Sequence, residues 1–289
     1  MSLHFASPAL TVAWLLAALA AAGQDAAKVE VALAPDAALT LEAFWEPCRS
    51  SKYNLFQETE ALRQPRPAEE RKRYDAAAFT PLLPVEPFEV GALWSIDAEA
   101  IVVFLKQFHP GARAELHHGG GAAPGAWACL RAASPERIEI LLRAHAEFEL
   151  EGGITYTPAQ FEGRLLLDRR DRSLISFHLA LPDRNTNVDV NVPAEFSETR
   201  DGQMRPSMAA DIGWVPRMEL VGGEQVALSP ASWERSISDA EARLLLARRF
   251  YACAVIDWLP FDEAVLRSRG EERPLHVIVL FGALDDESC

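Results

Sequence analysis

The chain has 289 residues, of which 49% are hydrophobic and 24% are charged. This composition suits one large or two ordinary globular domains, and it excludes a disordered chain and a polytopic membrane protein. The formal net charge of -14 argues against a nucleic-acid binder, which needs a basic surface. The four cysteines form no C-x-x-C pair, so they do not support a zinc site with paired ligands. The sequence does not decide whether any two of them form a disulfide.

The chain begins with an apolar run at residues 9–23, which is shorter than the roughly 20 residues that a membrane-spanning helix needs. Small residues close the run at positions 20–23, as at a signal-peptidase site. We therefore assign residues 1–27 to a signal peptide or membrane anchor. The protein is expected to be exported, and to be secreted, periplasmic or held at a membrane by its N-terminus. A mistaken start codon is the alternative.

Residues 28–95 form an N-terminal region and linker in this interpretation. Val29, Val31 and Leu33 alternate and predict a strand, and the charge run at residues 63–74 is typical of a solvated linker or helix face. Asp97 then stands at the N-cap of a predicted helix whose apolar face contains Ile101, Phe104, Leu105 and Phe108.

A glycine-rich loop with two adjacent histidines, His117 and His118, follows that helix. It is similar to the oxyanion-hole loop of esterases, but the G-x-S-x-G nucleophile elbow is absent. The two histidines come with no further metal ligands in a recognisable pattern. We interpret this segment as a flexible loop.

From residue 136 to residue 150 the hydrophobic period is two, which predicts one long half-buried strand. Its polar face is expected at the surface and carries Glu139, Arg143, His145, Glu147 and Glu149. Further strands are predicted at residues 161–167, 174–181, 188–192 and 212–220. Consecutive strands with short turns pair most simply as an antiparallel sheet of about five strands, in a β-rich domain at residues 96–235.

The last part of the chain has an α/β pattern. A capping box from Ser238 to Glu241 predicts a helix through Tyr251, and a second helix is expected from about Pro260 to Gly270. Residues 275–281 are apolar on both faces, as in the covered strand of an α/β sheet, and a loop then leads to Cys289. Strand, short loop and cysteine form the opening of a thioredoxin-like active site, where a helix N-terminus stabilises the thiolate.

The predicted fold class is therefore α+β, with an antiparallel β-rich middle domain followed by the N-terminal part of a thioredoxin-like domain at residues 236–289. The final eight residues, Gly-Ala-Leu-Asp-Asp-Glu-Ser-Cys, resemble the segment that precedes selenocysteine in the selenoprotein N family. Seven shorter segments resemble the same family in the same order: residues 108–110, 145–148, 158–161, 187–189, 211–213, 216–220 and 259–264.

The resemblance covers roughly residues 101–289, and it implies a thiol–disulfide oxidoreductase with a cysteine–selenocysteine pair. Selenocysteine is expected as the next residue, with the chain cut at its UGA codon. Cys289 is then the resolving partner of the selenocysteine, Ser288 belongs to the same motif, and the substrate is a redox protein or a peroxide. The chain as it stands is expected to be inactive, and a eukaryotic member would be located at the endoplasmic reticulum membrane.

The chain departs from animal members of the family in lacking a D-x-[DN]-x-[DN]-G loop, so it resembles a bacterial-type member without the EF-hand. We expect no calcium site, no other metal site and no further cofactor. Asp285 and Asp286 fit poorly with an activated thiol, because nearby carboxylates raise a thiol pKa.

The alternative is a non-enzymatic binding module in which the terminal cysteine is incidental. The nucleotides after the Cys289 codon distinguish the two hypotheses. A glycine codon and a helix–strand pattern would support the oxidoreductase, whereas a clean stop would support the binding module.

Overall fold

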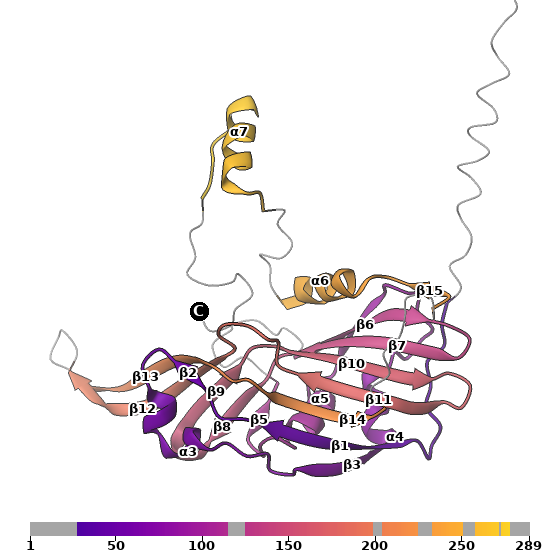
Figure 1. Cartoon of the computed structure of the whole chain (residues 1–289), viewed down its shortest axis with the longest axis horizontal. Helices are drawn as coiled ribbons and strands as arrows, with labels where there is room; N and C mark the ends of the chain where they lie inside the picture. Colours follow the sequence, from indigo (N-terminus) through magenta and orange to yellow (C-terminus); the bar gives the residue numbers. More distant parts are fainter. Residues whose placement is uncertain are drawn as a thin grey trace, which may run out of the picture.

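The computed structural model describes residues 28–114, 125–198, 204–224, 233–250, 258–271 and 273–277, with side chains at all of these positions other than 195–198 and 204–207. Two antiparallel β-sheets make up most of it and meet along a shared core (Figure 1). Helices accompany both sheets, so the structure fits the α+β class. The thioredoxin-like part of the predicted fold stays a prediction.

The spatial order of the strands differs from their order along the chain in both sheets. The first sheet contains, from one edge to the other, β15 (Arg235–Ser236), β6 (Ala126–Ala133), β7 (Arg137–Ala144), β10 (Phe161–Asp168), β11 (Ser173–Ala180), β14 (Met218–Gly223), β1 (Ala38–Trp45) and β3 (Arg71–Asp75), with β4 (Leu93–Ile96) paired to β6. The second contains β2 (Ser50–Ser51), β13 (Met204–Trp214), β12 (Val188–Glu198), β9 (Ile154–Pro158), β8 (Glu147–Leu150) and β5 (Ala112–Arg113).

Three of the connections between the two sheets are only two or three residues long, and we call them corners. These are residues 145–146 between β7 and β8, residues 159–160 between β9 and β10, and residues 215–217 between β13 and β14. Strands that switch sheets in this way are the usual corners of two sheets packed at a steep angle. The sequence prediction of one five-stranded sheet is therefore wrong.

The long strand predicted at residues 136–150 is two strands, β7 and β8, which belong to different sheets. The alternation continues through the corner because β7 and β8 point the same set of alternate side chains into one shared core. These buried residues are Ile138, Ile140, Leu142, Ala144, Ala146, Phe148 and Leu150. The strand predicted at residues 212–220 likewise divides between β13 and β14. A hydrophobic period reports burial of a face, and it cannot report which sheet buries it.

An aromatic cluster fills the core where the two sheets meet. The Trp45 ring of β1 lies 6.4 Å from Phe108, 5.7 Å from Phe148 and 5.1 Å from Tyr156, measured between ring centroids. The indole Nε1 of Trp45 donates a hydrogen bond of 3.2 Å to the Tyr156 hydroxyl, and burial raises the pKa of that phenol. Aromatic side chains bury the most area per residue, so this cluster is the main link between the sheets.

Two helices cover opposite faces of the first sheet. Helix α5 (Ala98–Leu105) packs into the main core, where the Phe104 ring lies 5.2 Å from that of Phe177 in β11. Helix α6 (Asp239–Phe250) lies on the other face over β6 and β7, where Ala242 and Leu246 form a second small cluster with Cys129 and Leu141 (Figure 1). Both faces of β7 are therefore covered.

The predicted helix starts are confirmed. The Asp97 carboxylate accepts a hydrogen bond of 2.8 Å from the Glu99 N–H, and the Ser238 hydroxyl accepts one of 3.1 Å from the Glu241 N–H. Caps use neighbours in the sequence, so a local pattern is enough to predict them. The remaining helices are α2 (Leu55–Glu58), α3 (Glu60–Arg63), α4 (Ala76–Phe79), η2 (Thr80–Leu82), η3 (Glu151–Gly153) and α7 (Phe261–Glu271).

The predicted buried strand at residues 275–281 is described only in part. Residues 275–277 form no strand, and the exposed fractions of Leu275 and Val277 are 39% and 53%. The rest of that segment and the predicted signal at residues 1–27 lie outside the described residues. In the described ranges, no helix has both the length and the apolar character needed to cross a bilayer.

A buried amide supports the corner between β13 and β14. The Asn187 side chain accepts a hydrogen bond of 2.7 Å from the Val215 N–H and donates one of 2.8 Å to the Val215 carbonyl. Asn187 thus provides the pairing that a neighbouring strand would have provided. Its exposed fraction is 2%, so water cannot replace it.

We expect the substitution Asn187→Ala to lower the free energy of unfolding by about 2–3 kcal/mol, because it leaves two buried backbone groups of Val215 unpaired. Urea unfolding followed by tryptophan fluorescence measures this loss. Asn191→Ala on β12 is the matched control, since the Asn191 side chain binds only Asp189 on its own strand. Equal effects of the two substitutions would contradict this role of Asn187.

Candidate functional site

The residues predicted to carry chemistry, Ser288 and Cys289, lie outside the described residues. The same holds for Asp285, Asp286 and the His117–His118 loop. The structure therefore describes the body that precedes the predicted redox segment. Its corners, charged interior and cysteines are the parts that bear on the site.

The segments that resemble the selenoprotein N family cluster at the corners of the fold. Five of them lie at a corner or directly beside one: residues 145–148, 158–161, 187–189, 211–213 and 216–220. These positions change sheet, and their backbone and polar groups must be satisfied inside the protein. The resemblance in the middle of the chain therefore reflects how the two sheets are joined.

The segment at residues 211–213 binds the loop before α2 through hydrogen bonds and close packing. The Asp211 carboxylate, 1% exposed, accepts three backbone hydrogen bonds of 2.8–3.0 Å, from Lys52, Tyr53 and Leu55. Two residues later, a Cβ at Gly213 would lie 2.5 Å from the Cys48 sulfur and 3.0 Å from the Phe56 ring. Only glycine fits there without displacing the loop.

The polar face of β7 and β8 is buried, so its prediction as a surface is wrong at most positions. The exposed fractions are 1% for Glu139, 4% for Arg143, 1% for His145 and 3% for Glu147, and only Glu149 is exposed. Pairing with an opposite charge lowers the free-energy cost of this burial, because a buried ionisable group without a partner would lose its charge. Glu147 lies 3.1 Å from the guanidinium of Arg113.

Arg143 and His145 fix the start of the corner after β7. The Arg143 Nε donates to the side-chain oxygen of Gln160, which belongs to the next corner along the chain. The backbone N–H of His145 donates a hydrogen bond of 2.8 Å to the Gly125 carbonyl. These residues join two corners and the start of β6, so their first role is positional.

A chain of alternating charges runs beneath α6. The Glu139 carboxylate contacts Arg131 and Arg164, at 2.5 Å for Arg164. Arg164 lies 2.6 Å from Asp239 at the first turn of α6, and Asp239 lies 2.6 Å from Arg243 one turn later. Arg243 in turn contacts Glu162, and Glu162 contacts Arg143, the last residue of this series of ion pairs.

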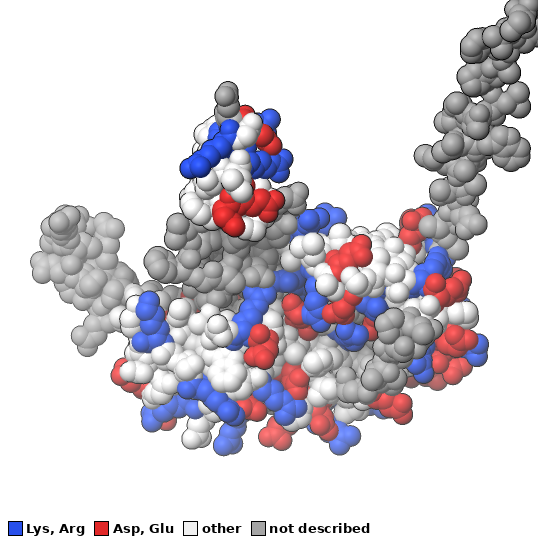
Figure 2. All heavy atoms as spheres, turned by 45° about the horizontal axis from the view of Figure 1, so that its top comes forward, with Lys and Arg blue, Asp and Glu red and all other residues white. Residues whose placement is uncertain are grey.

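Helix α6 is held by ion pairs as well as by apolar contacts. Only Ala242 and Leu246 of the helix are buried, whereas Asp239 and Arg243 each pair with groups on the sheet. Around α6, Figure 2 shows acidic and basic side chains intermixed. These ion pairs fix the position of α6 on the first sheet.

The comparisons with known proteins agree with the sequence motifs. The chain is 32% identical to selenoprotein N of Danio rerio over 215 residues, 64% of this chain and 37% of the relative. It is 30% identical to selenoprotein N of Mus musculus over 270 residues, 75% of this chain and 47% of the relative. Selenoprotein N of Homo sapiens is 29% identical over 265 residues, 73% of this chain and 43% of the relative.

This chain belongs to the selenoprotein N family. It spans less than half the length of these curated relatives. No family model and no solved structure matches it.

The two cysteines that this selenoprotein N-type body contains are poorly suited to redox chemistry. Cys129 is fully buried under α6, and desolvation raises its pKa to about 11, with a smaller contribution from Glu241. Cys48 is half-buried, and desolvation likewise raises its pKa, with Asp211 adding a small contribution. A raised pKa removes the thiolate that attacks disulfides. Cys253 and Cys289 lie outside the described residues.

We expect native Cys48 to react with iodoacetamide slowly at pH 7, and its rate to rise about tenfold per pH unit up to pH 9, because its thiolate fraction grows in that ratio below a raised pKa. Cys129 should react still more slowly. Mass spectrometry of the alkylated peptides measures both rates, with the protein in urea as the control in which the two sites react alike. A pH-independent rate at Cys48 would contradict the raised pKa.

The segment at residues 216–220 of this family member builds an ion cluster on β14. The Glu219 carboxylate lies 2.8 Å from His178 Nε2 and 2.6 Å from Arg217 Nε, and Arg217 also lies over the Phe44 ring. The hydrogen bond with His178, and next in size that with Arg217, lowers the pKa of Glu219 despite partial burial. The charged form of this carboxylate is therefore stabilised in the folded protein.

A lowered pKa in the folded state stabilises the protein above the unfolded value, and that contribution is lost as the pH falls through the folded value. We expect Glu219→Gln to lower the free energy of unfolding by about 1 kcal/mol at pH 6, and the difference to vanish well below pH 4. Urea unfolding across this pH range tests it. Glu224→Gln, at an exposed position just after β14, should have no effect at any pH.

The described ranges contain no group of three or more histidine, cysteine or acidic residues that could hold a metal ion. The body contains buried ion pairs, two thiols with raised pKa values, and ion pairs that hold α6 on the sheet.

Proposed function

We propose that this chain carries out thiol–disulfide exchange, with Cys289 as the thiol of a cysteine–selenocysteine pair. Two observations support the proposal: membership of the selenoprotein N family, and the final segment at residues 282–289, which resembles the family's segment before selenocysteine. The second observation carries it, because the chemistry needs a nucleophile in that segment.

In the proposed reaction a substrate disulfide is attacked first by the selenolate, which forms a mixed selenenylsulfide and releases one substrate thiolate. The Cys289 thiolate then attacks the selenium, displaces the second substrate thiolate and leaves a selenenylsulfide between the paired residues. The substrate gains two electrons and the pair loses them, so a cellular thiol must return them in the next cycle. The Ser288 hydroxyl, adjacent in the motif, can donate a hydrogen bond to the Cys289 thiolate.

The described body is consistent with a reaction that takes place at Cys289 and its selenocysteine partner. Its own thiols have raised pKa values, so they are poor competitors for the substrate disulfide. Helix α6, the last described helix before residue 251, is held on the sheet by ion pairs. We propose a redox protein or a peroxide as the substrate, and export directed by residues 1–27.

The competing hypothesis is a non-enzymatic binding module. One feature favours it: the described ranges contain no metal cluster and no activated thiol. Under this hypothesis the β-rich body binds a partner and Cys289 has no catalytic role.

The decisive experiment compares three forms of the protein in the reduction of a small disulfide by a thiol donor. They are the product of the gene translated through the codon after Cys289 in a host that inserts selenocysteine, its Cys289→Ser variant, and residues 1–289 alone. We expect activity only in the first form, with a loss of at least about tenfold in Cys289→Ser because the resolving thiol is removed.

Cys48→Ser in the first form is the matched control and should keep full activity, since that thiol is protonated at neutral pH. Equal activity of residues 1–289 and the selenium-containing form would refute the proposal. Inactivity of all forms would favour the binding module.

A further inference from the structure

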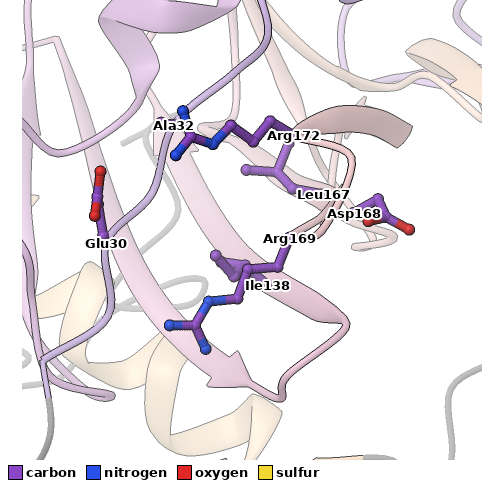
Figure 3. A pocket seen from close by; sticks show the side chains of 7 residues that line it. All are labelled: Glu30, Ala32, Ile138, Leu167, Asp168, Arg169 and Arg172. Atoms are coloured by element: carbon purple, nitrogen blue, oxygen red, sulfur yellow. The ribbon is translucent and has the colours of Figure 1, made fainter.

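A small cavity of about 110 Å³ lies between the segment at residues 30–32 and the turn that joins β10 to β11 (Figure 3). It lies at the opposite end of β10 from the Arg143–Gln160 corner. Apolar side chains of two neighbouring strands form part of its wall, and charged groups form the rest. Its lining residues are Glu30, Ala32, Ile138, Leu167, Asp168, Arg169 and Arg172.

The turn beside the cavity is held rigidly. The Asp168 carboxylate accepts hydrogen bonds of 2.8 and 2.9 Å from the N–H groups of Arg170 and Asp171. Arg172 adopts a left-handed backbone with φ of 53°, and its carbonyl accepts a hydrogen bond of 2.8 Å from the Ala34 N–H. A non-glycine residue in this conformation costs free energy, and the surrounding bonds maintain it.

The arginines of this turn differ in their partners. Arg170 pairs with Glu136. Arg169 donates one hydrogen bond of 3.2 Å to the Ser134 carbonyl, which leaves most of its five N–H donors available. Among the described residues, neither Arg169 nor Arg172 has a carboxylate oxygen within 4.0 Å. In the described part of the chain, two guanidinium groups at one cavity, the half-buried Arg169 and the exposed Arg172, thus have no carboxylate partner.

The view in Figure 3 shows how the charged groups are arranged. The side chains of Arg172 and Arg169 extend from the turn to the same side, and the Glu30 carboxylate lies across the space from them. Two cations and two anions line the cavity, but the Asp168 carboxylate points away from the space and accepts the N–H groups of its own turn. The two cations and the one anion that remain do not suit a bare dianion as well as a protonated one. A protonated oxyanion can accept hydrogen bonds from both arginines and donate its own proton to the carboxylate.

We propose that this cavity binds a phosphate group, held by Arg169 and Arg172 and selected by Glu30. Phosphate keeps one proton near neutral pH and can donate it to Glu30. Sulfate has the same shape and no proton at that pH, so it faces the Glu30 carboxylate without a hydrogen bond. The site then distinguishes phosphate from sulfate, which has the same size, because the Glu30 carboxylate repels the oxyanion that has no proton.

Isothermal titration of residues 1–289 with inorganic phosphate at constant ionic strength tests this. We expect binding at one site, weakened about tenfold or more by Arg172→Gln and by Arg169→Gln, because each removes a charge-assisted hydrogen bond. Arg170→Gln is the matched control in the same turn and should change the affinity less than about twofold. Circular dichroism confirms that each variant is folded.

A second arm replaces phosphate with sulfate. The native protein should bind sulfate more weakly than phosphate, and Glu30→Gln should tighten sulfate binding and remove the preference. A third arm uses a phosphate monoester, whose second pKa of about 6 leaves it without a proton at about pH 7.5. It should therefore bind more weakly than free phosphate, as sulfate does, which identifies free phosphate as the ligand. Binding equal to that of free phosphate would contradict the selection by Glu30.

Three results would overturn the proposal. They are no phosphate binding up to about 10 mM, equal losses from Arg170→Gln and Arg172→Gln, or a native protein that does not prefer phosphate over sulfate. None of these depends on redox activity, so the phosphate site and the oxidoreductase proposal can fail separately.

Discussion

The corners at which strands leave one sheet and enter the other are the constraint on which the rest of this structure depends. At a corner, backbone groups lose their strand neighbours while they stay in the interior, and an unpaired buried peptide group costs free energy. The protein meets this demand with short polar side chains. Asn187 pairs with both backbone groups of Val215, and Asp211 accepts three N–H groups from one loop.

This constraint explains why the family-like segments in the middle of the chain are short and widely spaced. Between corners, a strand needs only apolar side chains of suitable size on the buried face, which many sequences provide. At a corner, the geometry admits few residues. Gly213 shows this most directly, because a Cβ there would overlap the Cys48 sulfur. These segments thus indicate the family, whereas the proposed chemistry depends on a different segment, residues 282–289.

The sequence predicts what depends on neighbours along the chain, and it fails where partners are distant. Asp97 and Ser238 are predictable as caps because their acceptors and donors are two or three residues apart. The prediction of Glu139 at the surface is wrong because its partners, Arg131 and Arg164, come from other strands. No local pattern distinguishes a solvated polar face from one that a helix covers with matching charges. The predicted site at Cys289 rests on a motif, and the described structure does not reach it.

Strand β10 connects the features that remain. Its start belongs to a corner, its middle carries Glu162 and Arg164 toward α6, and its end forms the turn with Arg169 and Arg172. Along one strand, the same residue type is therefore used in two ways: Arg164 is saturated by carboxylates of the protein, and Arg172 is not. A guanidinium that pairs with the protein holds structure, whereas one that the fold leaves without an anion is available to a ligand. The contrast makes the turn, rather than the more extensive charge network under α6, the place where this body can recognise a small molecule.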